Sequence, residues 1–389
     1  MPTTTEAFVT PAILRWARER ARLSQQELAD KLHKTPESIA LWETGERRPT
    51  FRQAQRLANQ LQIPFGYLFL SSPPSEPIEL PDFRTVRDVE FAAPTAEFIN
   101  LLYDVLAKHS WYLTLQESEA AEELPFVDRF TLDTAPREVA KDIAETLDIT
   151  SGFRESIASW ESFIGRLGDK AERGGIMVMR SGLVAGNTRR RVSEKEFRGF
   201  AIADKLAPLI YINSSDAKAA QIFTLGHELA HIWTGQTGIS NESPADFNGR
   251  DVEQKCNAIA TELLVPQEEF THRWNPSRSL DANLSDTVHY FRVSSLVILR
   301  RTIELALLDP ELAWTRYRQE ERAHYRKSDD DGGQFWVNFF IRNGKLFTRA
   351  VMDAVQSERA LYTEAADLLN IRVPTIPKLA TELAKSPST

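Results

Sequence analysis

Two histidines four residues apart, with a glutamate directly after the first, form the pattern in this chain whose chemistry is most constrained. Residues 227–231 read His227-Glu228-Leu-Ala-His231. Residues four apart lie one above the other on an α-helix, so both imidazoles can reach one metal ion. Glu228 would then project beside the metal, where a carboxylate can take a proton from metal-bound water. The spacing predicts a metal site and its acid/base on one helix.

A catalytic zinc ion needs a third protein ligand and one open position. The next acidic residue in a strongly helical context is Glu253, and Asn257 lies one turn further on the same face. The amide oxygen of Asn257 could accept the free ring N–H of a metal-bound histidine and so fix its tautomer. Two imidazoles and one carboxylate favour zinc. We therefore predict that His227, His231 and Glu253 bind Zn²⁺ and that Glu228 is the catalytic acid/base.

The order of these residues resembles the gluzincins, in which a Glu-x-x-x-Asp helix completes a His-Glu-x-x-His site. Asn257 stands here in place of the aspartate, which keeps the hydrogen-bond acceptor and removes a charge. Cys256 could be considered as a soft ligand, but it points about 100° away from Asn257 on the helix. A lone helical cysteine is more often a small buried residue, and we expect that role for Cys256.

The elements around the metal helix are predicted from apolar patterning. A helical region is expected from about residue 83 to 167, and six aromatic residues in it are expected in the core: Phe98, Tyr103, Trp111, Tyr112, Trp160 and Phe163. Short apolar runs predict strands over residues 175–179 and 208–213. The second run shortly precedes the metal helix. We expect it at a sheet edge, where a substrate backbone could add by ladder hydrogen bonds.

After Pro266 the apolar patterning predicts elements but no further catalytic motif. A helical pair is expected within residues 284–301, a strand over 335–341, and helices over 347–355 and 363–369. Three residues in or before the helical pair are candidates for stabilising an oxyanion, although a structural role is favoured for each of them: His272, His289 and Tyr290.

Composition places the chain among soluble proteins of two or three domains. The 389 residues are 42% hydrophobic and 26% charged. No stretch approaches the roughly 20 apolar residues of a membrane span, and the N-terminus lacks an apolar signal core. The single cysteine excludes an intramolecular disulfide framework and fits a reducing cytosol. We expect a cytoplasmic protein with no membrane partner.

Charge is unevenly distributed along the chain. The formal net charge is −8, which argues against a protein that coats nucleic acid. Residues 1–80 carry ten Lys/Arg and nine Asp/Glu, a net charge of +1, which leaves −9 for the remainder. Only the first segment is therefore a plausible DNA-binding unit.

Capping residues divide the first seventy residues into short helices. Ser24 begins a capping box, Thr35 is expected to cap a helix with Pro36 at its first position, and Gly45 suits a left-handed end. Thr50 caps the next helix. Two brief helices joined by a tight turn and covered by others indicate a helix-turn-helix unit. The helices are expected over residues 11–21, 25–32, 35–44, from 51, and from 64.

Several groups of residues within these helices carry a family resemblance: Ser24-Gln25-x-Glu27-Leu28-Ala29, Ile39-Ala40-x-Trp42-Glu43-x-Gly45-x-Arg47-x-Pro49-Thr50, Leu57-Ala58 and Leu61-x-Ile63-Pro64. Together they resemble the Cro/C1-type (XRE) DNA-binding domain over roughly residues 11–70. The resemblance implies that residues 35–43 enter the major groove of double-stranded DNA. The open alternative is a retained fold that now serves protein contacts or dimerisation.

The expected DNA contacts are of two kinds. Glu37 could accept a hydrogen bond from cytosine and Leu41 could touch a thymine methyl group, and Ser38 lies on the same helix. Neither Glu37 nor Leu41 is a rich base reader, whereas relatives often carry glutamines in this region. Phosphate contacts that set register are expected from five other residues: Gln25, Lys34, Arg47, Arg48 and Arg52.

A second set of motifs spans the metal site: Arg198-Gly199-Phe200-Ala201-Ile202, the strand of residues 210–213, Phe223-Thr224-Leu225-x-His227-Glu228-Leu229-Ala230-His231, and Cys256-Asn257-x-Ile259-Ala260-x-x-Leu263-Leu264-Val265-Pro266. These resemble the ImmA/IrrE family of zinc metallopeptidases, from about Phe83 to the end of the chain. The resemblance implies the same ligands and the same acid/base as above. Its best-understood members cleave a Cro/C1-type repressor, usually on a separate protein.

We therefore expect a multidomain, mainly α-helical protein with a small β-sheet. An all-α helix-turn-helix domain should occupy residues 1–72 and a linker residues 73–81. An α+β gluzincin-like peptidase domain, including the helical region, should occupy residues 82–275. An α+β C-terminal extension over residues 276–389 is expected to act as a sensor or substrate-docking module.

The leading functional prediction is a zinc-dependent endopeptidase with a DNA-binding domain, which regulates transcription or stress responses by cleaving a Cro/C1-type repressor or a similar protein. The main alternative is a DNA-binding repressor or antitoxin, whose zinc domain is a non-proteolytic sensor or scaffold for a toxin-like partner. A weaker one is a toxin-like protease restrained by its own N-terminal domain. A homodimer is left open.

Overall fold

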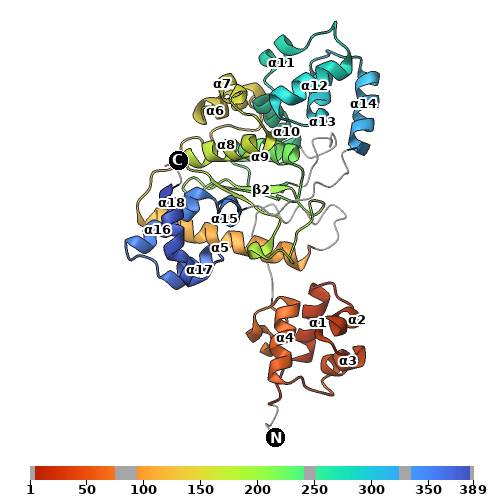
Figure 1. The fold of residues 1–389 in the computed structure, drawn as a ribbon, viewed down its shortest axis with the longest axis vertical. Coiled ribbons are helices and arrows are strands. Elements are labelled where there is room, and N and C mark those ends of the chain that lie inside the picture. Colours follow the sequence, from red (N-terminus) through yellow and green to blue (C-terminus); the bar gives the residue numbers. More distant parts are fainter. Residues whose placement is uncertain (1–4, 75–93, 241–250, 324–333, 386–389) are drawn as a thin grey trace. The chain divides into compact units, whose positions relative to one another are not determined.

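The computed structural model describes residues 5–74, 94–240, 251–323 and 334–385, and Figure 1 shows their fold. The predicted linker therefore lies almost wholly outside the described residues. The chain divides into two compact units, which are described separately. Among the described residues, no helix is long and apolar enough to cross a bilayer.

The first unit is all helical, as the sequence predicts. It contains α1 (Pro11–Arg20), α2 (Gln25–Leu32), α3 (Pro36–Thr44), α4 (Phe51–Leu61) and the short 3₁₀ helix η1 (Phe65–Phe69). The capping boxes that begin at Ser24 and Thr50 are both present, and Gly45 ends α3 with φ of 80°. Thr35 occupies the N-cap position of α3 but makes no capping bond, because its hydroxyl lies 3.2 Å from that of Ser38.

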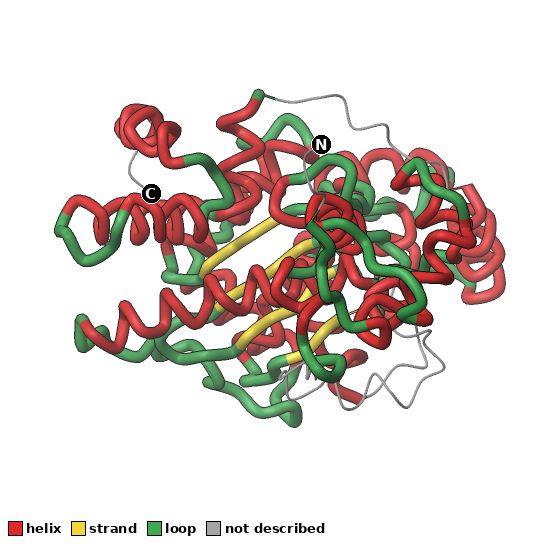
Figure 2. Tube along the Cα trace, turned by 90° about the horizontal axis from the view of Figure 1, so that it is seen from below, coloured by secondary structure: helices red, strands yellow, loops and turns green. Residues whose placement is uncertain are grey.

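The second unit is built around one small sheet. Its strands are β1 (Met177–Arg180), β2 (Gly199–Ile202), β3 (Leu209–Ile212) and β4 (Gly238–Ser240), in the order β1-β3-β2-β4. β1 and β3 are parallel, whereas β2 is antiparallel to both β3 and β4. Figure 2 shows these strands as a layer among helices.

The predicted edge position of the strand over residues 208–213 is wrong. β3 lies inside the sheet, where Tyr211 is opposite Met179 of β1 on one side and Phe200 of β2 on the other. All four residues of β3 are buried, so both of its faces are covered. A continuous apolar run of this kind is typical of an interior strand, since an edge strand with one wet face would alternate. β3 therefore has no free edge for a substrate.

Helices cover both faces of the sheet. Figure 1 shows α8 (Trp160–Arg173) and α9 (Lys218–Trp233) on one face, with α5 (Ala96–Ser118) and α15 (Phe335–Asn343) on the other. Beside α8 and α9 lie α6 (Pro136–Thr146), α7 (Ser151–Glu155) and α10 (Asp251–Leu264). The remaining helices of the unit are α11 (Gln267–Arg273), α12 (Leu280–Phe291), α13 (Ser295–Glu304), α14 (Pro310–Ala323), α16 (Lys345–Gln356), α17 (Tyr362–Leu368) and α18 (Ile376–Lys385), with 3₁₀ turns at Val184–Gly186 and Val373–Thr375.

The predicted helical pair within residues 284–301 is confirmed as α12 and α13. Leu284, Phe291 and Leu299 belong to the same apolar core as residues of α8, α9 and α10. The core is thus continuous across the predicted domain limit at residue 275, and the limit itself stays a prediction.

The predicted strand over residues 335–341 is wrong, because these residues form α15. The run is aromatic or aliphatic almost throughout and therefore carries no clear period of two. Its fully buried residues are Phe339 and Asn343, which are four apart and share one helical face. Gly344, with φ of 75°, separates α15 from α16. The predicted helices over residues 347–355 and 363–369 are confirmed as α16 and α17.

Glu172 of α8 supplies a cap that α16 lacks. Gly344 stands at the N-cap of α16 without a side chain, and the backbone N–H of Leu346 donates to Glu172 Oε1 at 3.1 Å. A Cβ on Gly344 would lie only 2.8 Å from that oxygen. Lys345 pairs with Asp169, also of α8, at 2.6 Å. Burial raises the pKa of the Glu172 carboxyl group to about 7, against the opposing effect of the Leu346 N–H.

Glu172→Gln is expected to flatten the dependence of stability on pH. The raised pKa means that the folded state binds the proton more tightly than the unfolded state, whose pKa is near 4.5. The resulting stabilisation is fully present below that value and is lost as the pH rises through about 7, by at most about 3 kcal/mol. Chemical unfolding of both proteins across this range measures the difference. A difference in unfolding free energy that does not change with pH would contradict the prediction.

Candidate metal centre

Helix α9 carries the two histidines through the centre of the second unit. Every residue from Gln221 to Trp233 is buried, so the helix is covered on all sides rather than on one apolar face. It packs against β2, β3, α8 and α10. Gly226 lets α10 approach closely, since a Cβ there would lie 3.2 Å from Leu264 Cδ1. A His-Glu pair on a helix so deeply buried is not a solvated surface feature.

Three predicted ligands converge at one point. The Nε2 atoms of His227 and His231 are 2.9 Å apart, and Glu253 of α10 places its two carboxylate oxygens 3.0 Å and 3.6 Å from them. Ligands about 2.0–2.1 Å from a tetrahedral zinc ion are about 3.3 Å apart, so these separations suit one ion. Among the described residues, His227, His231 and Glu253 form the cluster of metal-ligating side chains that could hold an ion.

Asn257 orients the first histidine. Its Oδ1 lies 3.0 Å from His227 Nδ1, and an amide oxygen can only accept. Nδ1 therefore carries a proton, and Nε2 is the ring atom that faces the other two ligands. Asn257 is buried, with about 1% of its surface exposed. The fourth member of the predicted set thus lies where it can fix a ligand tautomer.

Contact between the two imidazoles and the Glu253 carboxylate shifts the pKa values of Glu253 and His231. Burial alone would raise the pKa of Glu253, but hydrogen bonds from His227 and His231 hold it well below its usual range. Burial lowers the pKa of His231, while Cys256, Glu253 and Glu228 more than offset this and raise it well above 6.5. A cation that replaces the protons would be held by the same charges. Cys256 is fully buried, as predicted, and is not part of the converging group.

Glu228 lies between the metal group and strand β2. It is fully buried, and its charge acts on His231. Its Oε1 occupies space left by Gly199, because a Cβ on that glycine would lie 2.8 Å from Oε1. The same Cβ would lie 2.6 Å from Thr224 Cγ2 and 3.0 Å from the backbone oxygen of Tyr211. The sequence motif that begins at Arg198 includes Gly199 but did not predict its contact with Glu228.

Gly199→Ala is expected to displace the Glu228 side chain and destabilise the unit, because the backbone of β3 closes one side of the gap. Overpacking of this kind typically costs about 1–3 kcal/mol. Zinc affinity should change far less than hydrolytic activity, since no ligand is touched. Gly165→Ala, at a glycine with open space around it, is the matched control. Equal activity in Gly199→Ala and Gly165→Ala would show that the gap is unimportant.

The three oxyanion candidates all lie beyond α10. The Tyr290 ring packs under the Arg273 guanidinium at 3.9 Å, and His289 Nδ1 lies 3.1 Å from Arg292 Nη1. His272 is exposed on α11. These contacts give Tyr290 and His289 structural partners, and the structure brings none of the three into the converging group.

The predicted DNA contacts lie in the first unit. Lys34, Glu37, Arg47 and Arg52 are exposed, and Ser38 and Leu41 are half-buried on α3. The Arg48 guanidinium lies over the Phe8 ring at 3.9 Å.

Gln25 differs from the other predicted contacts because it is already engaged. Its Nε2 donates to Glu43 Oε2 at 2.8 Å, and Glu43 also accepts from Arg18 at 2.6 Å. This pairing raises the pKa of Arg18, which burial would otherwise lower. The sequence motif named Gln25 and Glu43 but did not predict their contact. The roles of all eight residues in DNA binding stay predictions.

Comparison with known families agrees with this architecture. Residues 14–68 match the helix-turn-helix family, and residues 171–302 match the IrrE N-terminal-like domain. Residues 343–382 match a domain of unknown function. No curated protein matches the chain.

The predicted family architecture is confirmed: the chain combines a helix-turn-helix domain with an IrrE-like domain of the metallopeptidase class. The expected fold class is also confirmed, with the corrections to β3 and α15 given above and one more: the C-terminal extension, which was expected to be α+β, contains only helices among its described residues. The two matches support a DNA-binding regulator with a metallopeptidase-like domain.

Proposed function

We propose that this protein is a zinc-dependent endopeptidase that regulates transcription by cleaving a regulatory protein. The observation that carries the proposal is the convergence of His227, His231 and Glu253 on one buried point, beside the carboxylate of Glu228. The match of residues 171–302 to a metallopeptidase-class domain supports it. Zinc fits the donor set of two imidazoles and one carboxylate, which is also the set of catalytic sites with an open fourth position.

A bound zinc ion would supply Lewis acidity and a water molecule whose pKa is lowered to about 7. The protein's own part follows from its side chains. His227, His231 and Glu253 would hold the ion, and Asn257 keeps the His227 lone pair directed inward. The Glu228 carboxylate would take a proton from the attacking water. The same carboxyl group would then donate that proton to the leaving amine.

The proposed substrate is a Cro/C1-type repressor or a similar regulatory protein in the cytoplasm. The helix-turn-helix domain on the same chain supports this choice, because it would bring the peptidase to the operator at which a repressor also binds. Proximity of this kind raises the effective concentration of a substrate without any new contact.

The experiment is a search for new protein N-termini. A repressor of the Cro/C1 type and a cell lysate are each incubated with purified protein that has been stripped of metal and then reloaded with zinc. We expect new termini that vanish on chelation and return with zinc. If the zinc-loaded protein produces none from either source, the peptidase proposal is wrong.

The second candidate is a DNA-binding repressor or antitoxin whose metal domain does not cut, with a toxin-like protein as its partner. The exposed basic side chains after α3 favour DNA binding in either case. We expect Arg47→Ala with Arg48→Ala to weaken binding to the protein's own promoter and to reduce the dependence of binding on salt. Lys385→Ala with Lys378→Ala removes two charges elsewhere and is the control. Equal binding by both variants would contradict the assigned DNA contacts.

A further inference from the structure

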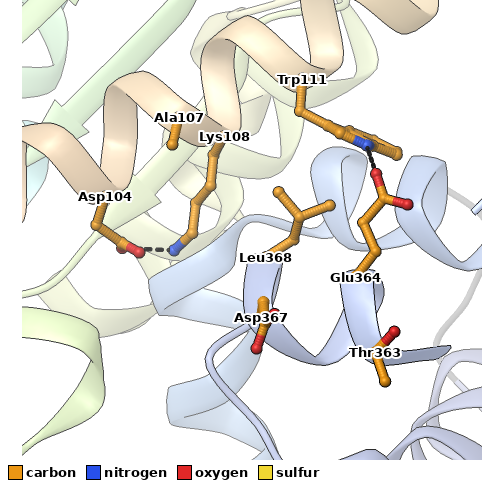
Figure 3. A pocket seen from close by; sticks show the side chains of 8 residues that line it. All are labelled: Asp104, Ala107, Lys108, Trp111, Thr363, Glu364, Asp367 and Leu368. Atoms are coloured by element: carbon orange, nitrogen blue, oxygen red, sulfur yellow. Dashed lines mark hydrogen bonds and ion pairs between the residues drawn. The ribbon is translucent and has the colours of Figure 1, made fainter. Parts of the chain in front are cut away.

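A groove separates α5 from α17, two helices that contribute nothing to the metal group. Its volume is about 480 Å³. One face of α5 supplies Asp104, Ala107, Lys108 and Trp111, which follow helical spacing, and α17 supplies Thr363, Glu364, Asp367 and Leu368. Figure 3 shows the two sets of side chains across the groove from each other. The α17 side belongs to the segment that matches a domain of unknown function.

Hydrogen bonds hold the walls of the groove in place. The Lys108 ammonium group donates to Asp104 Oδ2 at 2.8 Å and to Asn343 Oδ1 at 3.2 Å. Asn370, beyond the end of α17, donates to Asp104 Oδ1 at 2.9 Å. The Trp111 indole donates to Glu364 Oε1 at 2.8 Å, a bond drawn in Figure 3. The groove is therefore largely formed before any partner binds, which lowers the entropic cost of binding.

The charge of the groove is negative. It contains three carboxylates and one ammonium group, and that ammonium group is buried with only 3% of Lys108 exposed. The Lys108 ammonium group forms an ion pair with Asp104, which neutralises its charge. Glu364 and Asp367 are exposed, and no ion pair in the described part of the chain includes either of them. A cation that entered the groove would meet two carboxylates and the indole ring of Trp111, which also attracts cations.

Apolar side chains lie beside this charge. Leu361 and Tyr362, at the start of α17, are 71% and 52% exposed. Leu368 lines the groove itself. Trp111 was expected in the core, but it is only half-buried and packs edge-on against Phe347 at 5.9 Å. Acidic groups next to exposed apolar and aromatic side chains suit a peptide segment rather than an inorganic ion.

We propose that this groove, which we call the α5–α17 groove, binds a segment of a partner protein that presents an arginine or lysine flanked by apolar side chains. The basic side chain would lie between Glu364 and Asp367 over Trp111, and the flanking residues would cover Leu361 and Tyr362. Charge complementarity selects this occupant, because nucleic acid and acidic peptides would be repelled. The binding requires no proteolysis, so it stands or falls apart from the proposed peptidase function.

Four peptide libraries with the same apolar flanks test the proposal, each with arginine, lysine, glutamine or glutamate at its central position. Binding to the full chain is measured by fluorescence polarisation. We expect the arginine and lysine libraries to bind, the other two to bind about tenfold more weakly, and the preference to shrink at high salt. Glu364→Gln with Asp367→Asn should abolish the preference.

The control is Asp353→Asn with Glu358→Gln, which removes two exposed charges from the same segment outside the groove. This variant should bind as the wild type does. Equal binding of the four libraries would overturn the proposal. So would an unchanged preference in the Glu364→Gln, Asp367→Asn variant, with its fold checked by circular dichroism.

Discussion

His231→Ala is expected to lower the affinity for zinc by roughly a thousandfold, which corresponds to about 4 kcal/mol. His231 Nε2 lies 2.9 Å from His227 Nε2 and 3.6 Å from Glu253 Oε1, so its removal leaves only two of the three protein ligands. The stabilisation that excess zinc gives to the folded wild type, about 4 kcal/mol at a thousand times the dissociation constant, should largely disappear.

Competition with a chromogenic chelator measures the affinity, and thermal unfolding with and without zinc measures the stabilisation. His272→Ala is the matched control, because it removes an exposed imidazole from α11 outside the converging group. If both variants bound zinc as tightly as the wild type, the metal would have to lie elsewhere.

Glu228→Gln is expected to lower the rate of hydrolysis by about 10²- to 10⁴-fold, while the protein still binds one zinc ion. Glutamine has nearly the same shape, so the gap at Gly199 stays filled and the packing against β2 is kept. What it loses is the ability to take a proton. The measurement pairs a cleavage rate with zinc content determined on the same sample. A variant that has lost both would show that Glu228 supports the fold, and one that keeps its cleavage rate would exclude an acid/base role.

The metal group was predictable because most of its geometry is local. Helical periodicity alone places His227 above His231, and Glu253 one turn before Asn257. What helical periodicity does not supply is the packing of α10 on α9, which brings Glu253 to the two histidines. The first unit was predictable for a similar reason, since capping residues such as Ser24 and Thr50 mark helix starts through contacts only three residues long.

Features that depend on distant contacts were not predictable. The interior position of β3 follows from pairing with β1 and β2, which the run of residues 209–212 does not encode. The gap at Gly199 exists only because α9 crosses β2 at Glu228.

Two further features show the same limit. Glu172 and Gly344 are 172 residues apart in the sequence, so the local sequence around either residue could not predict their contact. An aromatic-rich run such as 335–341 suits either a strand or a helix, and its packing on β1 decided the outcome.

X-ray absorption at the zinc edge, on protein reloaded with one equivalent of zinc, identifies the atoms that bind the metal. We expect a single site with two imidazole nitrogens, oxygen ligands from a carboxylate and from water, and no sulfur. In His231→Ala the number of imidazole nitrogens bound to zinc should fall from two to one. A sulfur ligand, which only Cys256 among cysteines could provide, or a site whose spectrum is unchanged in His231→Ala, would contradict this expectation.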